Sequence, residues 1–489
     1  PVHFFLLQCL PWVGEYAPHR TWPRRHDLPA ADREGIMADW VGASSEELTA
    51  AYARQDVSPV TVAEALFDHA ARRDAALGAV RVLSREAALE SAAASERRWR
   101  RHAPQSPLDG VPVMLREDIA VPSYANEVEG VSPVVARLLE AGCIILGKTV
   151  MAAHDSLVAG RCIEGRLVQN PWQPALTSGG SSCGAAVACA AGYAPLHIGI
   201  DRIGSARLPA AFCGVFGFKP TQGRVPLGKP STGRVAAPIT RSVHDAAALM
   251  NILVRPDDRD FTSLPPESLE YRMRVDGLSP KSLSVAVLTD MGLGPAVDPV
   301  IRQTVQEAAR LLQMAGASVE MIDSFLAPEM FESVQILLEA DAHLDLQAMS
   351  EQERMRLPSF VTDWAGQRAD ALTGQQIMQA WRDITAMRAA INEAMMGYDY
   401  LLMPVSPVMP WAATSLSPGN DPAGGLPHVV FTAPWNFAEH PAASLNWRHG
   451  ADGVPIGLQV VGHRFDDLGV LRLSRTLEIM RPEQAAWPQ

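Results

Sequence analysis

Residues 177–223 constrain the fold more than any other stretch, because they concentrate glycine, serine and alanine around two short turns. The first cluster reads Gly179-Gly180-Ser181-Ser182, and the second is Gly204-Ser205. Residues this small are needed where another chain segment approaches the backbone closely or where φ is positive. The stretch therefore predicts two tight turns flanking a closely packed helix near 185–191, and Ser181 and Ser205 are its candidate functional side chains.

Strand and helix patterns alternate on both sides of this stretch. The segment LDGVPVMLREDIAV (108–121) reads as a buried strand whose end carries Arg116, Glu117 and Asp118. A helix opening at Ser132-Pro133 and a short strand at 143–146 follow. Residues 283–322 repeat the pattern, with a helix that Asp298-Pro299 opens. This alternation predicts an α/β fold in which helices cover a sheet.

Two regions read as mainly helical. In the first, Ser44 and Glu47 form a capping box, Ser58-Pro59 opens a second helix and residues 84–101 form a third. The second region is 325–396. Residues 37–489 are expected to form a single domain, whereas residues 1–36 differ in character and are interpreted as an extension that is disordered or foreign to the native protein.

Composition excludes several classes of function. A net charge of −12 disfavours nucleic acid or an anionic membrane as the main partner. The six cysteines form no C-x-x-C pair, so they are expected to be reduced in a cytoplasmic protein. The 13 histidines have no metal-ligand spacing, and neither a phosphate-binding loop nor a dinucleotide fingerprint occurs. No cofactor or metal is expected.

Each serine cluster has a structural and a catalytic interpretation. Ser181 and Ser182 precede a helix, where a serine is a common cap, but backbone N–H groups at such a point also attract negative charge. Ser205 follows the apolar run 196–200 on a glycine turn, which suits either a plain β-turn or a nucleophile. The G-x-S-x-G pattern around Ser182 lacks the strand that a nucleophile elbow needs, and Arg207 reads as structural.

Several stretches in their order resemble the amidase signature family, above all 108–119, 132–149, 170–225 and 431–462. The resemblance implies a large mixed sheet covered by helices on both sides, and hydrolysis of carboxamides by a Ser–Ser–Lys triad. It places the nucleophile at Ser205 and the bridging serine, which follows a cis peptide bond, at Ser181. It implies an oxyanion hole at Arg202, Ile203 and Gly204, and a supporting loop at Gly179, Gly180 and Ser182.

Three residues depart from the family pattern, and one of them is Cys183, which replaces a glycine. The family's lysine falls on Arg116, and a guanidinium does not lose its proton at physiological pH, so it is a very poor general base. The chain has only four lysines, and Lys148 and Lys219 fall on family positions that do not supply the base. Ile203 replaces a glycine of the oxyanion turn and would be badly suited to a positive φ.

The first functional hypothesis is therefore an amidase that cleaves a carboxamide C–N bond of a small-molecule substrate through a serine acyl-enzyme. The alternative is a catalytically impaired or inactive protein that uses the amidase fold for binding. A further alternative is an amidotransferase A-like subunit, which would need partner subunits. Association as a homodimer is left open by the sequence.

Overall fold

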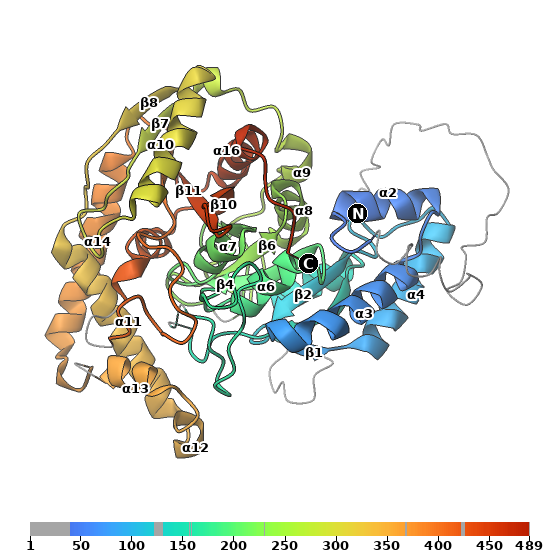
Figure 1. Cartoon of the computed structure of the whole chain (residues 1–489), viewed down its shortest axis with the longest axis horizontal. Coiled ribbons are helices and arrows are strands. Elements are labelled where there is room, and N and C mark those ends of the chain that lie inside the picture. The colour runs from blue at the N-terminus through green and yellow to red at the C-terminus, as the bar shows by residue number, and fades with distance from the viewer. Residues whose placement is uncertain are drawn as a thin grey trace, which may run out of the picture.

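The computed structural model describes residues 40–121, 131–155, 157, 159–228, 230–366, 369–421 and 426–488 (Figure 1). The predicted extension at 1–36 lies outside these residues.

Within the described residues, eleven strands form one mixed sheet in the order β1-β3-β2-β4-β6-β5-β10-β11-β9-β7-β8. Strand β2 pairs in parallel with β3 and β4, and β7 pairs in parallel with β8 and β9, whereas the remaining pairs are antiparallel. The expected large mixed sheet is confirmed. The strands are β1 (Val80–Leu83), β2 (Pro112–Arg116), β3 (Ile144–Thr149), β4 (Leu196–Asp201), β5 (Phe216–Lys219), β6 (Val235–Thr240), β7 (Ser284–Val287), β8 (Ser318–Met321), β9 (Tyr400–Pro404), β10 (Ala442–His449) and β11 (Pro455–Gly462).

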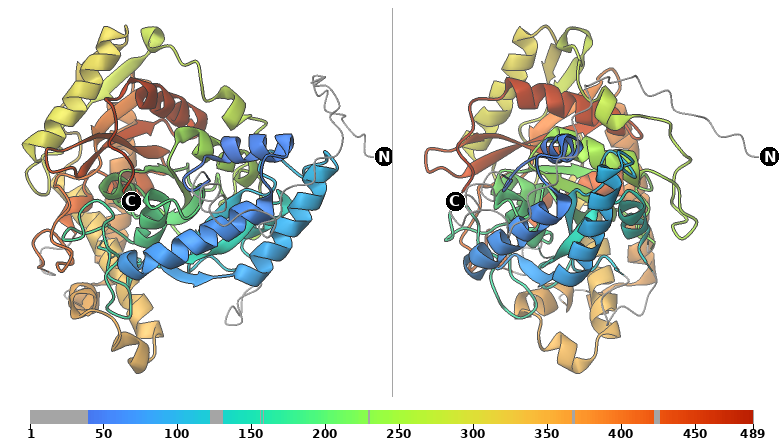
Figure 2. Two further views of the ribbon diagram at one scale, coloured as in Figure 1. Left: turned by 45° about the vertical axis from the view of Figure 1, so that its right-hand side comes forward. Right: turned by 90° about the vertical axis from the view of Figure 1, so that its right-hand side faces the viewer.

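Helices cover both faces of this sheet (Figure 2). Alternating side chains of β2 divide between the two faces, with Val113 and Leu115 in one core cluster and Met114 in another. The helices packed on the first face are α5 (Pro133–Glu140), α8 (Val243–Leu253), α9 (Tyr271–Arg274), α10 (Pro299–Met314) and α16 (Asp467–Met480). The helices on the opposite face include α2 (Ser45–Arg54), α3 (Pro59–Leu77), α4 (Arg85–Arg100), α6 (Cys183–Ala190) and α7 (Arg207–Cys213).

The region 325–396 is helical, as predicted. It forms α11 (Pro328–Ala348), α12 (Glu351–Arg354), α13 (Ser359–Gly366) and α14 (Gly374–Ala394), and the short α15 (Ala433–Phe437) packs against α11 and α14. Figure 1 shows this group at the end of the molecule away from α2, α3 and α4. The fold therefore has helical layers at both ends of the sheet, with the glycine- and serine-rich stretch between them.

The caps predicted from sequence begin the expected helices. Ser44 and Glu47 form a reciprocal capping box at the start of α2, and the Ser58 side chain accepts a hydrogen bond from the Thr61 N–H at the start of α3. Asp298 caps α10 in the same way. Strands β1, β5 and β6, by contrast, were not predicted from the sequence.

Candidate active site

The candidate site lies where β2 and β4 end side by side. These strands are parallel neighbours, so Arg116 at the end of β2 and the turn after Asp201 of β4 reach the same edge of the sheet. The Gly179–Ser182 loop joins them from the start of α6, because the Ser182 N–H donates to the Ser205 carbonyl at 2.9 Å. Arg116, Ser181, Ser182 and Ser205 are all fully buried. The fold thus brings together the residues that the resemblance singled out.

Gly204 gives the turn before Ser205 its shape. Its φ is +111°, a conformation that side chains rarely adopt, and an added Cβ would lie 2.4 Å from Thr432 Oγ1. Ile203 is not among the residues with positive φ, so the predicted conflict with a β-branched side chain does not arise. The Ile203 side chain instead lies in the core, and its carbonyl accepts a hydrogen bond from Thr432 Oγ1 at 2.6 Å.

The carboxylate of Asp201 stabilises the same turn through hydrogen bonds to its backbone. It accepts hydrogen bonds from the N–H groups of Gly204 at 2.9 Å and of Ala206 at 3.2 Å. Arg207 pairs with this carboxylate at 3.0 Å, and both side chains are fully buried. The interpretation of Arg207 as a structural residue agrees with this contact.

The backbone donors expected to form an oxyanion hole differ in availability. The Gly204 N–H is already bound to Asp201, so it does not face outward as an oxyanion donor. Across the described ranges, the N–H groups of Arg202, Ile203 and Ser205 have no hydrogen-bond partner. Among the described residues, the N–H groups at 202, 203 and 205, and not that at 204, therefore lack a protein acceptor.

The Gly179–Ser182 loop presents two serines with different partners. The peptide bond between Gly180 and Ser181 is cis. Ser182 Oγ donates to the Ile200 carbonyl at 2.9 Å and accepts from the Ile200 N–H at 3.1 Å, which fixes the loop to β4. Ser181 Oγ makes its contacts with charged groups, as described next. Of the two hydroxyls, only that of Ser181 contacts a carboxylate, whereas that of Ser182 meets a charged group only at Arg116 Nη1, 3.5 Å away.

Arg116 is a fixed cation beside Ser181. Its Nη1 donates to Ser181 Oγ at 2.8 Å and to Asp155 Oδ1 at 2.9 Å, while Nε and Nη2 bind Asp118 at 2.7 and 2.5 Å. Burial disfavours the charged guanidinium, but Asp118 and Asp155 outweigh that effect and raise the pKa of Arg116 above its usual value. Arg116 therefore stays protonated and only donates hydrogen bonds.

Asp155 is a site residue that the sequence analysis missed. It follows β3 in a segment with no recognisable motif, and only the fold brings it to Ser181, 26 positions further along the chain. Ser181 Oγ donates to its Oδ1 at 2.8 Å, and Ser205 Oγ donates to its backbone carbonyl at 3.3 Å. No sequence pattern links Asp155 to either serine cluster, so the sequence alone carried no signal for its place in the site.

The two lysines closest to the site in sequence are occupied elsewhere. Lys148 Nζ donates to the Glu117 carbonyl at 3.2 Å. Lys219 is fully buried and donates to the Pro220 carbonyl at 3.0 Å. Burial, aided by Arg207, lowers the pKa of Lys219 to about 7. This lysine could accept a proton at neutral pH, but its recorded partner is a carbonyl and neither serine.

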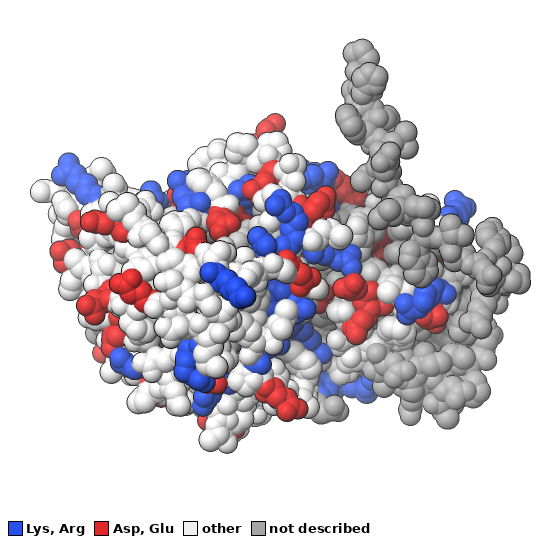
Figure 3. All heavy atoms as spheres, turned by 90° about the horizontal axis from the view of Figure 1, so that it is seen from above, with Lys and Arg blue, Asp and Glu red and all other residues white. Residues whose placement is uncertain are grey.

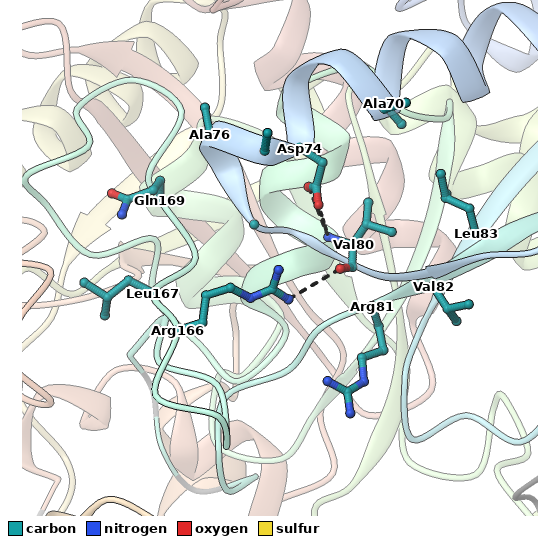
Figure 4. Close-up of a pocket in the computed structure, with 13 residues that line it drawn as sticks. Ala70, Asp74, Ala76, Val80, Arg81, Val82, Leu83, Arg166, Leu167 and Gln169 are labelled. Carbon is teal, nitrogen blue, oxygen red and sulfur yellow. Dashed lines mark hydrogen bonds between the residues drawn. The ribbon is translucent and has the colours of Figure 1, made fainter.

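A surface hollow beside β1 is lined by residues other than those of the candidate site. It encloses about 760 Å³ beside β1, where Asp74 accepts hydrogen bonds from the Val80 N–H and Arg166 donates to the Val80 carbonyl (Figure 4). Neither candidate serine lines it. In the part of the chain that the structure describes, no three His, Cys, Asp or Glu side chains gather as a metal site. Every helix there is too short or too polar to cross a bilayer.

An α/β sheet that presents polar side chains at the ends of parallel strands has the usual place for an active site in this class of protein. The chain belongs to the amidase family, whose model, described as Amidase, matches residues 61–471. This result confirms the resemblance seen in the sequence, and family membership supports an enzyme that hydrolyses amides.

Similar proteins include both amidases and amidotransferase subunits. An acylamidase of Rhodococcus erythropolis is 30% identical, over 90% of this chain and 95% of its own length. A glutamyl-tRNA(Gln) amidotransferase subunit of Symbiobacterium thermophilum is 28% identical, over 91% and 98%. The crystal structure of a bacterial aryl acylamidase of the amidase signature family superposes with a TM-score of 0.83, at 26% identity, over 91% of this chain and 97% of that chain.

Proposed function

We propose that this protein hydrolyses the C–N bond of a carboxamide through an acyl-enzyme on Ser205. The observation that carries the proposal is the junction of the two serine loops, in which the Ser182 N–H binds the Ser205 carbonyl at 2.9 Å. This junction keeps Ser181 and Ser205 in one buried site with free N–H donors at 202, 203 and 205.

The reaction proceeds in two halves. Ser205 Oγ attacks the carbonyl carbon while its proton leaves toward Ser181, and the N–H groups of Arg202, Ile203 and Ser205 stabilise the oxyanion. The C–N bond then breaks, and the departing nitrogen takes a proton returned through Ser181. Water attacks the acyl-enzyme, releases the carboxylic acid and restores the Ser205 hydroxyl.

Arg116 has a positioning role in this scheme. Its guanidinium donates to Ser181 Oγ at 2.8 Å and is itself held by two hydrogen bonds to Asp118. Because it has no lone pair to accept a proton, it orients Ser181 and stabilises negative charge but does not act as the base.

The substrate we propose is a small molecule with an acylated amine. The similarity to an acylamidase and to an aryl acylamidase makes an anilide the first compound to test. Figure 3 shows acidic and basic side chains interspersed on one face, without a broad basic surface that would attract nucleic acid.

Two other functions remain candidates. The raised pKa of Arg116 and the complete burial of Ser205 favour a protein that binds a ligand without turning it over. The similarity to a glutamyl-tRNA(Gln) amidotransferase subunit favours a chain that works with partner proteins. Isolation of stoichiometric partners with the native chain would favour the second of these.

The proposal is tested by treating the protein with a fluorophosphonate and locating the adduct by mass spectrometry. We expect the adduct on Ser205 and hydrolysis of p-nitroacetanilide, and loss of both in Ser205→Ala. Ser178→Ala is the matched control, because Ser178 is a fully buried serine whose hydroxyl donates to the Val168 carbonyl at 2.9 Å. Absence of both labelling and turnover in the parent, with either appearing in Arg116→Lys, would show instead that Arg116 silences the site.

A further inference from the structure

Ser181 has one hydrogen-bond acceptor among the described side chains, and it is Asp155. The distance from Ser181 Oγ to Asp155 Oδ1 is 2.8 Å. Arg116 Nη1 contacts the same hydroxyl at 2.8 Å but can only donate. The hydroxyl proton of Ser181 therefore points at the carboxylate, and its oxygen accepts the hydrogen bond from Arg116.

Asp155 also contacts the proposed nucleophile. Its backbone carbonyl accepts the Ser205 hydroxyl at 3.3 Å. A single residue thus holds both serines, one through its carboxylate and one through its main chain. No other described residue receives hydrogen bonds from both hydroxyls.

We propose that the Asp155 carboxylate is the terminal proton acceptor of this site, a role that Arg116 cannot fill because its guanidinium only donates hydrogen bonds. The inference rests on the proposed function. Arg116 then serves as a permanent counter-charge that holds the carboxylate and Ser181 in contact, since its Nη1 donates to both.

The proton transfers of this reaction balance without any further reactant. As Ser205 Oγ bonds to the carbonyl carbon, its proton moves to Ser181 Oγ and the Ser181 proton moves to Asp155 Oδ1. As the tetrahedral species collapses and the C–N bond breaks, Asp155 returns its proton to Ser181 Oγ and Ser181 gives its own proton to the leaving nitrogen, while Ser205 Oγ stays acylated. Deacylation repeats the cycle with water as the nucleophile.

The groups that face Asp155 set the pH range of this acceptor. Arg116 binds Oδ1 at 2.9 Å, Arg234 lies 3.4 Å from Oδ2, and Arg202 adds a more distant positive charge. Burial raises the pKa of Asp155, but the three arginines outweigh it and hold that pKa well below its usual range. Asp155 therefore remains ionised into acid, and it is a weaker base than a free aspartate. We expect slow acylation whose rate does not change between pH 5 and pH 9.

Asp118 provides a matched control. It binds Arg116 through two hydrogen bonds and also accepts from Arg234 Nη2 at 2.6 Å, so its charge environment is similar. Within the described residues it makes no hydrogen bond to either serine. A role limited to pairing Arg116 would make the two aspartates equivalent, whereas proton transfer requires only Asp155.

The experiment measures the rate of fluorophosphonate labelling of Ser205 from pH 4 to pH 10 in the parent, Asp155→Asn and Asp118→Asn. We expect Asp155→Asn to lower the rate by about 100-fold or more, since general-base catalysis contributes about 10²–10⁴-fold, and Asp118→Asn to stay within about tenfold of the parent. Asp155→Glu should recover part of the loss. Equal losses in both asparagine variants would overturn the proposal.

Folding of each variant is checked by circular dichroism and thermal melting. If Asp155→Asn does not fold, the parent pH profile decides. A rate that is constant from pH 5 to pH 9 supports a carboxylate, and a rate that rises between pH 7 and pH 10 contradicts it. Failure of the proposed function is a separate outcome, because the parent would then leave Ser205 unlabelled at every pH.

Discussion

Replacing Arg207 by methionine tests whether a buried ion pair holds the turn that carries Ser205. The Arg207 guanidinium bonds to both Asp201 oxygens at 3.0 Å, to Gln459 Oε1 at 2.8 Å and to the Thr432 carbonyl at 3.1 Å. Methionine fills much of the same volume without the charge. The variant therefore leaves Asp201 buried with its charge uncompensated while it still binds the turn N–H groups.

The expected loss can be worked from the Asp201 carboxyl. Burial raises the pKa of Asp201, but Arg207 and Asn436 outweigh it and lower that pKa to about 2 from 3.8. A difference of nearly two units corresponds to about 2 kcal/mol of stability, and breaking a buried pair typically costs about 3–5 kcal/mol. We expect Arg207→Met to lower the free energy of unfolding by about 3 kcal/mol or more at pH 7.

The pH dependence has a definite sign. Because the folded-state pKa is depressed, the pair stabilises the native protein above pH 4, and the contribution disappears as pH falls toward 2. Urea unfolding of the parent and Arg207→Met should therefore give free energies that differ at pH 7 and converge in acid.

Two variants complete the test. Arg54→Met removes an exposed pair with Asp56 and should change the unfolding free energy by less than about 0.5 kcal/mol. Adding Asp201→Asn to Arg207→Met should cost less than the sum of the two single changes, because no buried charge is then left unpaired. An effect of Arg207→Met below about 1 kcal/mol, or strict additivity, would refute the reasoning.

Two further substitutions probe the site and its support. Gly204→Ala places a Cβ 2.4 Å from Thr432 Oγ1 at a φ of +111°, so fluorophosphonate labelling of Ser205 should fall at least about tenfold, and Thr432→Ala should restore part of it; an unchanged labelling rate would contradict the tight turn. The pKa of Lys219 is lowered to about 7 from 10.5. Between these two values the unfolded chain holds a proton on Lys219 that the folded protein has lost, so raising the pH favours the folded state. The free energy of unfolding should therefore rise by roughly 4 kcal/mol from pH 7 to pH 10. Urea unfolding of Lys219→Met should show no such rise, and a rise equal to that of the parent would assign it to another group.

The sequence predicted the helices that begin at a recognisable capping side chain. Ser44 with Glu47, Ser58 with Pro59, and Asp298 with Pro299 satisfy backbone N–H groups locally, so they mark helix starts without knowledge of the fold. Strand β6 has no such signal, since Pro238 interrupts it and a proline argues against a central strand. Its place between β4 and β5 depends on tertiary pairing alone.

Some residues of the candidate site could likewise be predicted from the sequence, and others could not. Ser181, Ser205 and Arg116 could be predicted because they lie in recognisable stretches of the chain. Asp155 could not, because its partners Arg116 and Ser181 are 39 and 26 positions away and no spacing rule connects them. The hydrogen bond from the Gly204 N–H to Asp201 could not be predicted either, because it depends on the path of the turn rather than on residue type.

The strand order has a consequence for how the chain is made. Strands β1 to β6 adjoin one another, and so do β7, β8 and β9, but β10 and β11 are the strands that connect the two groups. These two strands, of which the second ends at Gly462, come after the other nine in the chain, so they leave the ribosome after them. During synthesis the first group can assemble early, yet the sheet stays in two pieces with unpaired edges on β5 and β9 until β10 and β11 have been made. A nascent chain stalled before residue 442 would therefore be a good client for chaperones that shield strand edges.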